Sequence, residues 1–400
     1  MPQRPADHRR ARVRHPWQGL SGLPATVWLV CGTTFINRLG TMALPFLLLY
    51  LTEGRRWSAE EAGVAMMVYG AGGLVSAPLS GRLADRLGHA RVLKASLLLS
   101  GAVLLAIPLA AGRPLLFLLV GVWAALGQAF WPSAMALLVG QAPPEKRKAV
   151  WALHRLAVNL GMAVGPALGG LIAHHDFRWV FWVDGFTTVV SGVLLVLFLG
   201  RIPNAPAEGG APGRSPWTDG RLAYLLLGFL PVLAEFFQIE GALPLWVVRD
   251  LGLGTRFFGL IFTLNTLLIV VLEIALNLAM ARWSHGRQLA LGCLCYALGF
   301  GLTGLAHDRL PLLGTVVVWT FGEMILLPAM SDAVATLAPA DRRGEYMGLY
   351  SLSFAAALAL GPWLGVLAYA RLGPAATWGG CALLGLASAA LLGRFRTSPA

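Results

Sequence analysis

Long runs of apolar residues follow one another along the whole chain, separated by short stretches that carry most of the charged residues. A helix needs about 20 mostly apolar residues to cross the hydrocarbon core of a membrane. Runs of this length lie near residues 24–50, 60–80, 92–111, 115–139, 149–173, 178–200, 222–248, 257–281, 288–306, 311–336, 345–370 and 375–393. The pattern predicts an all-α integral membrane protein with twelve transmembrane helices. The first run is too long for a signal-peptide core, so we expect it to be retained.

The composition excludes a water-soluble protein. Of the 400 residues, 57% are hydrophobic and 12% are charged, whereas roughly 25% of residues are charged in an ordinary soluble domain. The same figures exclude a disordered chain, because disordered segments are poor in apolar residues. The four cysteines, Cys31, Cys293, Cys295 and Cys381, all fall in apolar runs and indicate no disulfide framework.

Basic residues gather on one side of the predicted membrane. With an even number of spans both termini share a side, and 22 of the 31 Lys and Arg residues fall on it. Because short cytoplasmic loops are enriched in bases, we predict a multi-pass protein of the cell (inner) membrane with both termini in the cytoplasm. This bias, together with contact between the basic tail and anionic lipid headgroups, accounts for the net charge of +12 without a nucleic-acid partner.

A Pro- and Gly-rich segment separates the first six predicted spans from the last six, as a flexible linker does. We therefore predict five regions: a basic cytoplasmic tail over 1–22, a six-helix bundle over 23–200, a cytoplasmic linker over 201–220, a second six-helix bundle over 221–393 and a short tail over 394–400.

The two predicted bundles repeat each other in sequence. At an offset of 196 residues Pro132 pairs with Pro328, Gly165-Pro166 with Gly361-Pro362, and Gly169 with Gly365. At an offset of 199, Ala43-Leu44-Pro45 pairs with Ala242-Leu243-Pro244. Two six-helix bundles related by a pseudo-two-fold axis are typical of secondary transporters, which bind their substrate between the bundles near the midplane.

The turn after the second predicted span reads G-R-L-A-D-R-L-G-H-A-R over residues 81–91, with an acid among bases. Such an acid can accept hydrogen bonds from a helix N-terminus, where the helix dipole favours negative charge. The turn resembles motif A of the major facilitator superfamily, with His89 at a position where that family usually has Lys or Arg. The resemblance covers essentially the whole chain and implies a cytoplasmic latch between the turn and the start of helix 11. Its residues are Gly81, Asp85, Arg86, Gly88, Arg91, Arg342 and Arg343.

The fifth predicted span carries closely spaced glycines that leave one smooth helix face, so that another backbone can approach. This run resembles motif C of the drug:proton antiporter branch of the superfamily, although simple helix packing is an alternative role. Its residues are Gly161, Gly165, Pro166, Gly169 and Gly170. In the fourth span Trp123 stands where that branch has an arginine linked to proton transfer.

Ionisable residues within the predicted spans are candidates for proton coupling or for the substrate cavity. An unpaired charge at the bilayer centre costs about 2.5–3.5 kcal/mol on insertion scales, so these side chains are expected to face the interior. The acids are Asp184, Glu235, Glu240, Glu273, Glu323 and Asp332, and Asn37-Arg38 is the polar pair of the first span.

Among these acids, Glu323 is the first candidate to carry a proton because it lies near the middle of its span, and Glu240 is the second. Asp184 and Asp332 lie nearer span ends, where capping or pairing is the alternative role. Arg38 is expected either to neutralise one of the acids or to bind an anionic substrate.

The leading functional hypothesis is a proton-coupled exporter of amphipathic or cationic organic compounds that works by alternating access. An uptake symporter for a small nutrient or organic anion and a non-transporting membrane sensor are the alternatives. No sequence motif of an enzyme, metal site or nucleotide cofactor is present. We therefore expect a monomer in the lipid bilayer that handles a small-molecule substrate and protons without a cofactor.

The predicted topology places residue 210 in the cytoplasm. A single cysteine introduced there, in a background without the four native cysteines, should react with a permeant maleimide and stay protected from an impermeant one added to whole cells. Labelling by the impermeant reagent in intact cells would overturn the topology.

Overall fold

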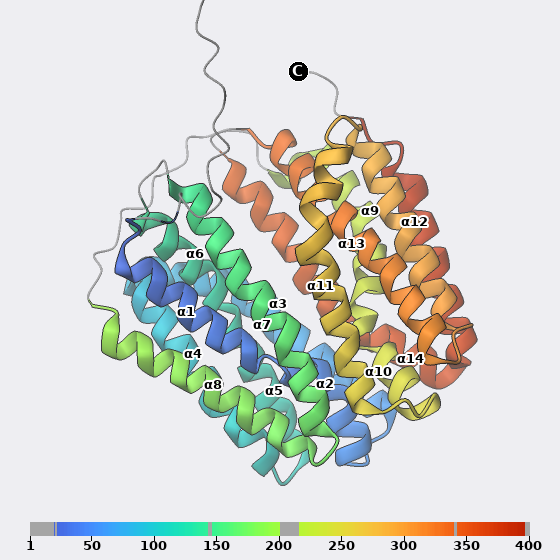
Figure 1. Ribbon diagram of the computed structural model, residues 1–400, viewed down its shortest axis with the longest axis horizontal. Coiled ribbons are helices and arrows are strands. Elements are labelled where there is room, and N and C mark those ends of the chain that lie inside the picture. Colours follow the sequence, from blue (N-terminus) through green and yellow to red (C-terminus); the bar gives the residue numbers. More distant parts are fainter. Residues whose placement is uncertain (1–19, 21, 143–145, 201–215, 340–341, 397–400) are drawn as a thin grey trace, which may run out of the picture.

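The computed structural model describes residues 20, 22–142, 146–200, 216–339 and 342–396, and it contains helices and no strand within those ranges (Figure 1). The helices of the first half are α1 (Ala25–Gly40), α2 (Ala43–Leu49), α3 (Ala59–Leu87), α4 (His89–Ala106), α5 (Arg113–Gln128), α6 (Phe130–Gln141), α7 (Arg147–Ala173) and α8 (Phe177–Phe198). Those of the second half are α9 (Gly220–Phe236), α10 (Ala242–Pro244), α11 (Gly254–Met280), α12 (His285–Thr303), α13 (Arg309–Leu337) and α14 (Arg343–Leu392).

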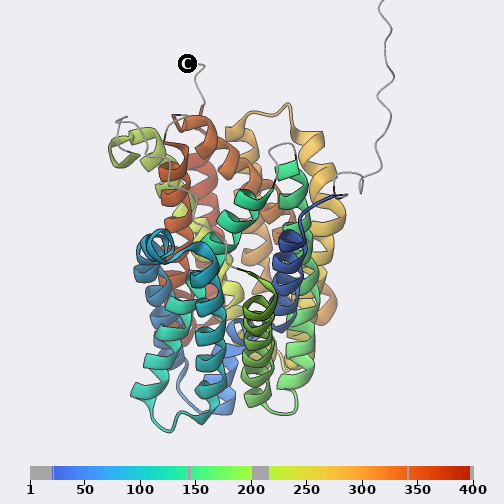
Figure 2. The same ribbon diagram turned by 90° about the vertical axis from the view of Figure 1, so that its left-hand side faces the viewer.

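The two halves form two groups of helices that lie side by side. Figure 1 shows the first half in blue to green and the second half in yellow to red. Figure 2 shows that most helices run along one common direction. We call the end where α8 stops at Phe198 and α9 starts at Gly220 the linker end, and the end with the turns before Phe177 and Gly254 the opposite end.

Within the described residues, ten helical segments are long and apolar enough to span a membrane, whereas the sequence predicts twelve spans. One of the ten, Arg343–Leu392, contains 50 residues, and Gly373 interrupts it with a non-helical φ of 83°. A straight helix of that length would extend about 75 Å, more than twice the thickness of the hydrocarbon core. The difference of two spans has two sources. The 50-residue segment counts once although it has two arms, 343–372 and 374–392, and the less apolar helix α12 is not counted.

Large apolar side chains cover the outer faces of the helices. Ile274, Leu278 and Leu310 expose between 72% and 80% of their surface. In a protein whose helices cross a membrane, apolar side chains of this kind face lipid. The helix backbone needs no partner from the lipid, because its polar groups are hydrogen-bonded within the helix.

The first and seventh predicted spans are both broken near their middle. In the first span α1 ends at Gly40 and α2 restarts at Ala43, followed by a π-helical turn, Tyr50–Gly54. In the seventh span α9 ends at Phe236, a 3₁₀ turn follows, and α10 restarts at Ala242 before a π-helical turn, Leu245–Asp250. The two restarts coincide with the Ala-Leu-Pro repeat, so equivalent positions of the repeat break in the same way.

Glycines let a neighbouring helix pack directly on each break. A Cβ at Gly165 would lie 2.8 Å from the carbonyl oxygen of Arg38 in the first break. A Cβ at Gly361, the repeat partner of Gly165, would lie 2.9 Å from the carbonyl oxygen of Ala234 beside the second break. Both distances are too short for a real Cβ, so the repeated glycines are required by the same backbone contact in each half.

The halves contact each other mainly through α3 with α14 and α7 with α11. Gly70 of α3 lies against the backbone of Ala359 of α14. On the other side of the interface the hydroxyl of Thr255 donates to the carbonyl of Gly170 at 2.9 Å. At the opposite end Arg371 of α14 donates to Glu60 of α3 at 2.9 Å. The halves are therefore closed together toward the opposite end.

The Gly70 contact predicts an overpacking effect. In Gly70→Ala the new methyl group would overlap the backbone of Ala359, and overpacking of this kind costs about 1–3 kcal/mol. We expect a lower midpoint of thermal unfolding for the purified protein. Gly32→Ala is the matched control, because a Cβ at Gly32 meets nothing within 4 Å. Equal unfolding temperatures for the two variants would show that the halves do not pack at Gly70 in the membrane protein.

Candidate functional site

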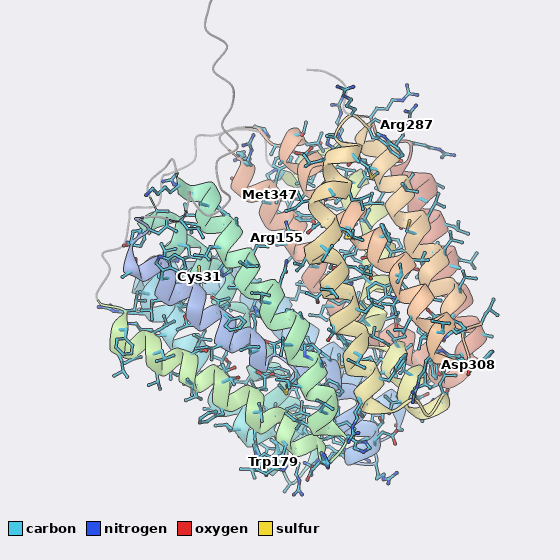
Figure 3. The ribbon with its side chains drawn as sticks, viewed as in Figure 1. Cys31, Arg155, Trp179, Arg287, Asp308 and Met347 are labelled. Carbon is cyan, nitrogen blue, oxygen red and sulfur yellow. The ribbon has the colours of Figure 1, made fainter. Side chains whose placement is uncertain are left out.

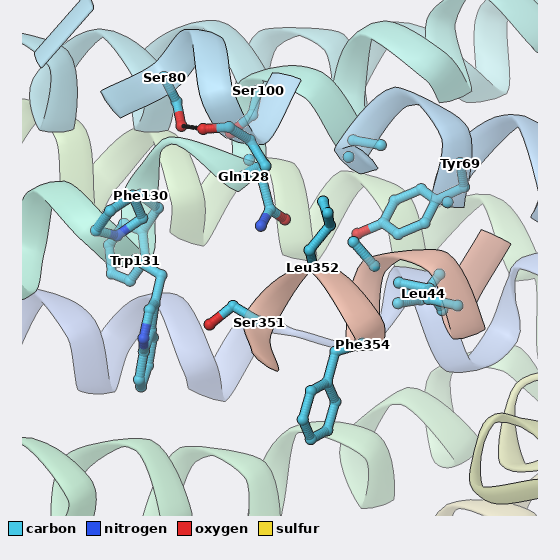
Figure 4. A pocket seen from close by; sticks show the side chains of 18 of the residues that line it. Leu44, Tyr69, Ser80, Ser100, Gln128, Phe130, Trp131, Ser351, Leu352 and Phe354 are labelled. Atoms are coloured by element: carbon cyan, nitrogen blue, oxygen red, sulfur yellow. Dashed lines mark hydrogen bonds between the residues drawn. The ribbon is translucent and has the colours of Figure 1, made fainter. Parts of the chain in front are cut away.

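A cavity of about 1140 Å³ lies between the two halves (Figure 4). Helices α1 to α6 and α8 supply its walls from the first half, and α14 supplies most of the wall from the second half. Trp217 and Glu345, both near the linker end, belong to its lining. We call this the main cavity.

The main cavity exists because α3 and α14 diverge from their contact at Gly70 and Ala359. Ala77 of α3 and Leu352 of α14, about two helical turns farther toward the linker end, already line the cavity on opposite sides. Ser80 and Gly348 continue the two walls in the same direction. The cavity is therefore closed at the opposite end and widens toward the linker end.

The wall from the first half includes four aromatic side chains, those of Tyr69, Trp123, Phe130 and Trp131. Tyr69 and Trp123 pack edge to face with their ring centroids 4.7 Å apart. Trp131 and His154 form a similar pair at 5.2 Å. Figure 4 shows Gln128 extending its amide across the cavity toward Leu352 of α14. An apolar surface with a few polar groups is typical of a site for small organic molecules.

Arg38 and Asn37 line the main cavity at the last turn of α1. The guanidinium carbon of Arg38 lies 5.6 Å from the centre of the Phe130 ring, a cation–π contact. The Nε of Arg38 is buried and has no hydrogen-bond partner. Asn37 donates from Nδ2 to the hydroxyl of Thr188 at 2.9 Å. Arg38 therefore enters the cavity with donor capacity that the protein itself does not use.

Asp184 of α8 also borders the main cavity, but its oxygens are occupied by the break in the first span. Its Oδ2 accepts hydrogen bonds from the backbone amides of Met42 at 3.2 Å and Ala43 at 3.0 Å. Its Oδ1 accepts from the hydroxyl of Thr188 at 3.4 Å. The amides of Met42 and Ala43 are the free N–H groups at the start of α2, where the helix dipole favours an anion.

A second cavity of about 580 Å³ lies between α7, α11 and α13. Three of the predicted acids, Glu273, Glu323 and Asp332, line it together with Arg155 and Asn159 of α7. The structure thus separates the predicted site residues into two groups. The polar pair of α1, Asn37 and Arg38, faces the main cavity, and these three acids face the second cavity.

The second cavity is crossed by an ion pair between the two halves. Arg155 of α7 pairs through Nη2 with Oε2 of Glu273 of α11, and Figure 3 shows Arg155 at the boundary between the two groups of helices. Glu273 is 9% exposed, so most of its surface is removed from solvent. The Arg155 guanidinium balances the charge of a carboxylate that would be costly to bury alone.

Glu323 lies deeper in the second cavity. Its Oε2 accepts a hydrogen bond from Nδ2 of Asn265 at 2.8 Å, and the same Nδ2 lies 3.1 Å from the hydroxyl of Thr320. No base pairs with Glu323 among the residues that the structure describes. A carboxyl with one neutral partner and access to a cavity can take up or release a proton without breaking an ion pair.

Asp332 lies at the rim of the same cavity and pairs with Nε2 of His285 of α12 at 2.8 Å. Its side chain is 73% exposed. Pairing, the alternative role considered for Asp332, is the arrangement in the structure.

Glu235 and Glu240 line neither cavity. Glu235 is fully buried inside the second half, where a Cβ at Gly385 would lie 2.8 Å from its Oε2, and its two oxygens have no hydrogen-bond partner. Glu240 lies at the break between α9 and α10, and its Oε2 is buried without a partner. Unpartnered buried carboxyls are least costly in the neutral form.

The motif A turn lies at the linker end, where the halves are apart. Asp85 is exposed at the end of α3, and Gly88 separates α3 from α4 with a φ of 97°. At the start of α14, Nε of Arg342 lies 3.7 Å from Oε1 of Glu345. The latch between Asp85 and Arg342 or Arg343 belongs to a conformation closed at the linker end, and it stays a prediction.

The motif C-like glycines lie on two faces of α7. Gly161, Gly165 and Gly169 face the α1–α2 break, at Arg38, Leu39 and Met42. Gly170 and Pro166 face α11 of the second half, at Thr255 and Gly259. Helix α7 is thus packed between the break that carries Arg38 and the partner half.

Sequence reasoning missed several side chains of both cavities. Arg155 falls within the predicted fifth span, 149–173, but was not among the candidate site residues; the structure places it on α7, where it pairs with Glu273. Asn265 and Gln128 are uncharged, so a search for ionisable groups does not find them. A search for amides within the predicted spans would have identified both.

The sequence is similar to one protein family and to individual transporters of that family. A sequence model described as Major Facilitator Superfamily matches residues 30–254 and 224–400. The MFS-type transporter YqjV of Bacillus subtilis is 25% identical over 353 residues, which cover 86% of this chain and 85% of the relative. The multidrug resistance protein MdtH of Edwardsiella ictaluri is 24% identical over 371 residues, which cover 88% of this chain and 89% of that protein.

A comparison with solved structures supports the fold alone. The peptide transporter POT in complex with sulfate superimposes with a TM-score of 0.79 and 21% sequence identity, covering 94% of this chain and 95% of that chain.

The hydrogen bonds of Asp184 predict a structural role. Asp184→Ala would leave the buried amides of Met42 and Ala43 without partners, and each unsatisfied group costs about 1–3 kcal/mol. We expect a clearly lower midpoint of thermal unfolding, with a smaller loss for Asp184→Asn, which keeps one acceptor oxygen. Asp332→Ala, at an exposed aspartate, is the control and should unfold with the wild type. An Asp184→Ala variant as stable as Asp332→Ala would contradict the capping role.

Proposed function

Because the chain belongs to the major facilitator superfamily, we propose that this transporter exports amphipathic organic compounds in exchange for protons. The observation that carries the proposal is the pair of separate cavities. One is large and lined by aromatic side chains, and the other is small and lined by acids. A compound and a proton therefore have separate binding places in one conformation.

The positive-inside rule orients the main cavity. The basic turns gather at the linker end, which is the side that the rule assigns to the cytoplasm. The main cavity widens toward this end, so a compound would enter it from the cytoplasm or the inner leaflet. A rocking motion would then part the Gly70–Ala359 and Thr255–Gly170 contacts and close the linker end. In that closed state Asp85 would meet Arg342 or Arg343 at the start of α14.

The second cavity supplies the proton site. Glu323 has Asn265 as its hydrogen-bond partner and communicates through the cavity with the rim at Asp332, near the linker end. In this conformation a proton on Glu323 would leave toward the cytoplasm while the main cavity receives a compound. Glu240, in the break of the seventh span, is the second proton candidate. Binding of a compound and loss of a proton in the same state is what exchange requires.

Uptake of a small organic anion is the second candidate function, favoured by Arg38 in the main cavity. The direction of flux distinguishes the two. An exporter that exchanges protons would move a compound against the direction of proton flow, whereas a symporter would move both in the same direction.

The proton site is tested by Glu323→Gln in proteoliposomes. The neutral amide resembles a permanently protonated acid, so we expect transport driven by a pH gradient to be abolished while compound binding and compound–compound exchange persist. Proton movement is followed with a pH-sensitive dye and binding by tryptophan fluorescence.

Glu235→Gln is the matched control for this test. It removes the same acid from the same half at a position that borders neither cavity, and it should retain transport driven by the pH gradient. Normal gradient-driven transport in Glu323→Gln and also in Glu240→Gln would reject both proton candidates.

A further inference from the structure

We propose that the main cavity selects organic anions, namely aromatic compounds that carry a carboxylate or a similar acidic group, and that Arg38 binds the acidic group. This inference rests on the proposed function only in taking the main cavity as the compound site. It concerns which compounds bind there and is independent of the direction of flux and of proton coupling.

The first argument is the charge of the cavity wall. Its charged lining residues are Arg38, Asp184 and Glu345. Asp184 accepts the amide hydrogen bonds of the α1–α2 break, and Glu345 lies at the mouth, 53% exposed and 3.7 Å from Arg342. Within the described part of the chain, no carboxylate lies within 4 Å of the Arg38 guanidinium. Arg38 and Asp184 attract each other electrostatically but form no ion pair within 4 Å, and the Asp184 oxygens already accept hydrogen bonds, so Arg38 keeps donors for a ligand.

The second argument is the state of the guanidinium itself. Arginine carries five N–H donors. The Nε of Arg38 is enclosed by the protein without an acceptor, so a ligand in the cavity would be bound through the terminal Nη groups. The Phe130 ring covers one face of the group at 5.6 Å but accepts no in-plane hydrogen bond. The donors at the edge of the plane match the two oxygens of a carboxylate, the acceptor that binds a guanidinium in a bidentate manner.

The third argument is the rigid placement of Arg38. A Cβ at Gly161 would collide with the Cβ of Arg38, so α7 holds the backbone of this turn directly. After Arg38 the chain enters the break between α1 and α2, which is fixed by the hydrogen bonds from Met42 and Ala43 to Asp184. A charged group held on a supported backbone loses little freedom when it binds a ligand.

The rest of the cavity fits the apolar part of such a compound. The paired rings of Tyr69 and Trp123 lie in the same wall, and Leu352 and Phe354 of α14 lie among the lining residues of the facing wall. Figure 4 shows Gln128 between these walls, where its amide can hydrogen-bond a polar substituent. The volume of about 1140 Å³ slightly exceeds that of sites for drug-sized ligands, about 300–1,000 Å³.

The same wall disfavours a cationic compound. The acids that a cation would need, Glu273, Glu323 and Asp332, line the second cavity, between α7, α11 and α13, and are not among the lining residues of the main cavity. A cation in the main cavity would meet the Arg38 charge without a free carboxylate beside it. The acids in the predicted spans would favour a cationic compound only if they shared a cavity with it, and these three acids line the second cavity.

The experiment measures equilibrium binding to the purified protein in phosphatidylcholine nanodiscs, which exclude anionic lipid from the cavity. The probes are 1-naphthoate, 2-naphthalenesulfonate and the cation 1-naphthylmethylammonium, which share one ring system and differ in charge. Quenching of the cavity tryptophans reports binding. We expect both anions to bind at least about tenfold more tightly than the cation, the factor that corresponds to one charge-assisted hydrogen bond.

Variants at Arg38 identify the residue responsible. Arg38→Gln should weaken binding of the anions about tenfold or more and leave the cation unchanged or improved, and Arg38→Lys should restore part of the anion affinity. Arg287→Gln removes one exposed base at the linker end (Figure 3) and should bind all three probes as the wild type does. Thermal unfolding confirms that each variant is folded.

Several results would overturn the inference. They are equal binding of anions and cation by the wild type, absence of anion binding, and anion affinity unchanged in a folded Arg38→Gln protein. Anion selectivity that depends on Arg38 but comes without any proton-driven flux would leave this inference intact and reject the proposed proton exchange.

An anion from the membrane is distinguished in a further arm. Nanodiscs that contain phosphatidylglycerol should reduce naphthoate affinity if a lipid headgroup competes for Arg38. In that case Arg38→Gln would remove the competition, and the lipid would be the anion that the cavity binds. Equal naphthoate affinity in both lipids would assign the site to the soluble aromatic anion.

Discussion

A helix that is broken inside a membrane leaves backbone N–H groups that lipid cannot satisfy, and this constraint organises the structure around the first and seventh spans. In the first half Asp184 accepts from the amides of Met42 and Ala43. In the second half Gln238 accepts from the amide of Ala242 at 3.3 Å and donates to the carbonyl of Gly361 at 2.7 Å. Each break is therefore held by a side chain, and each hydrogen-bonded side chain ties the break to another span of its own half.

The glycine repeat follows from the same constraint. A broken span presents carbonyls and amides on its surface, and only a helix face without side chains can approach them closely. Gly165 does so at the first break and Gly361 at the second. The backbone contact fixes the last turn of α1, which carries Arg38, and another face of α7 packs against α11. The contact between the halves and the placement of the cavity base thus depend on one run of small residues.

Separation of charge between the two cavities is the feature that carries the functional proposals. Arg38 reaches the main cavity, whereas Glu273 and Glu323 reach the second cavity, and the two cavities share no lining residue. If the base and the acids faced one cavity, they would neutralise each other, because opposite charges in a medium of low dielectric constant attract strongly. The Arg155–Glu273 pair shows this outcome where a base of α7 does reach an acid of α11.

The sequence by itself determined the class of protein, because a chain with so many apolar runs has no other way to satisfy its backbone than membrane-spanning helices. The repeat also predicted the relation between the halves, since the Ala-Leu-Pro and Gly-Pro positions recur with the order of the spans. Which residues share a cavity was decided by the tertiary structure alone. A helix turns by about 100° per residue and its neighbours are set by packing, so the sequence could not separate Glu323 from Arg38 or show that Glu235 faces the interior of its own half. The role of Asp184 was likewise decided by the tertiary structure. The amides that donate to its carboxylate lie more than 140 positions away in the chain, and only the break in the first span leaves them free to do so.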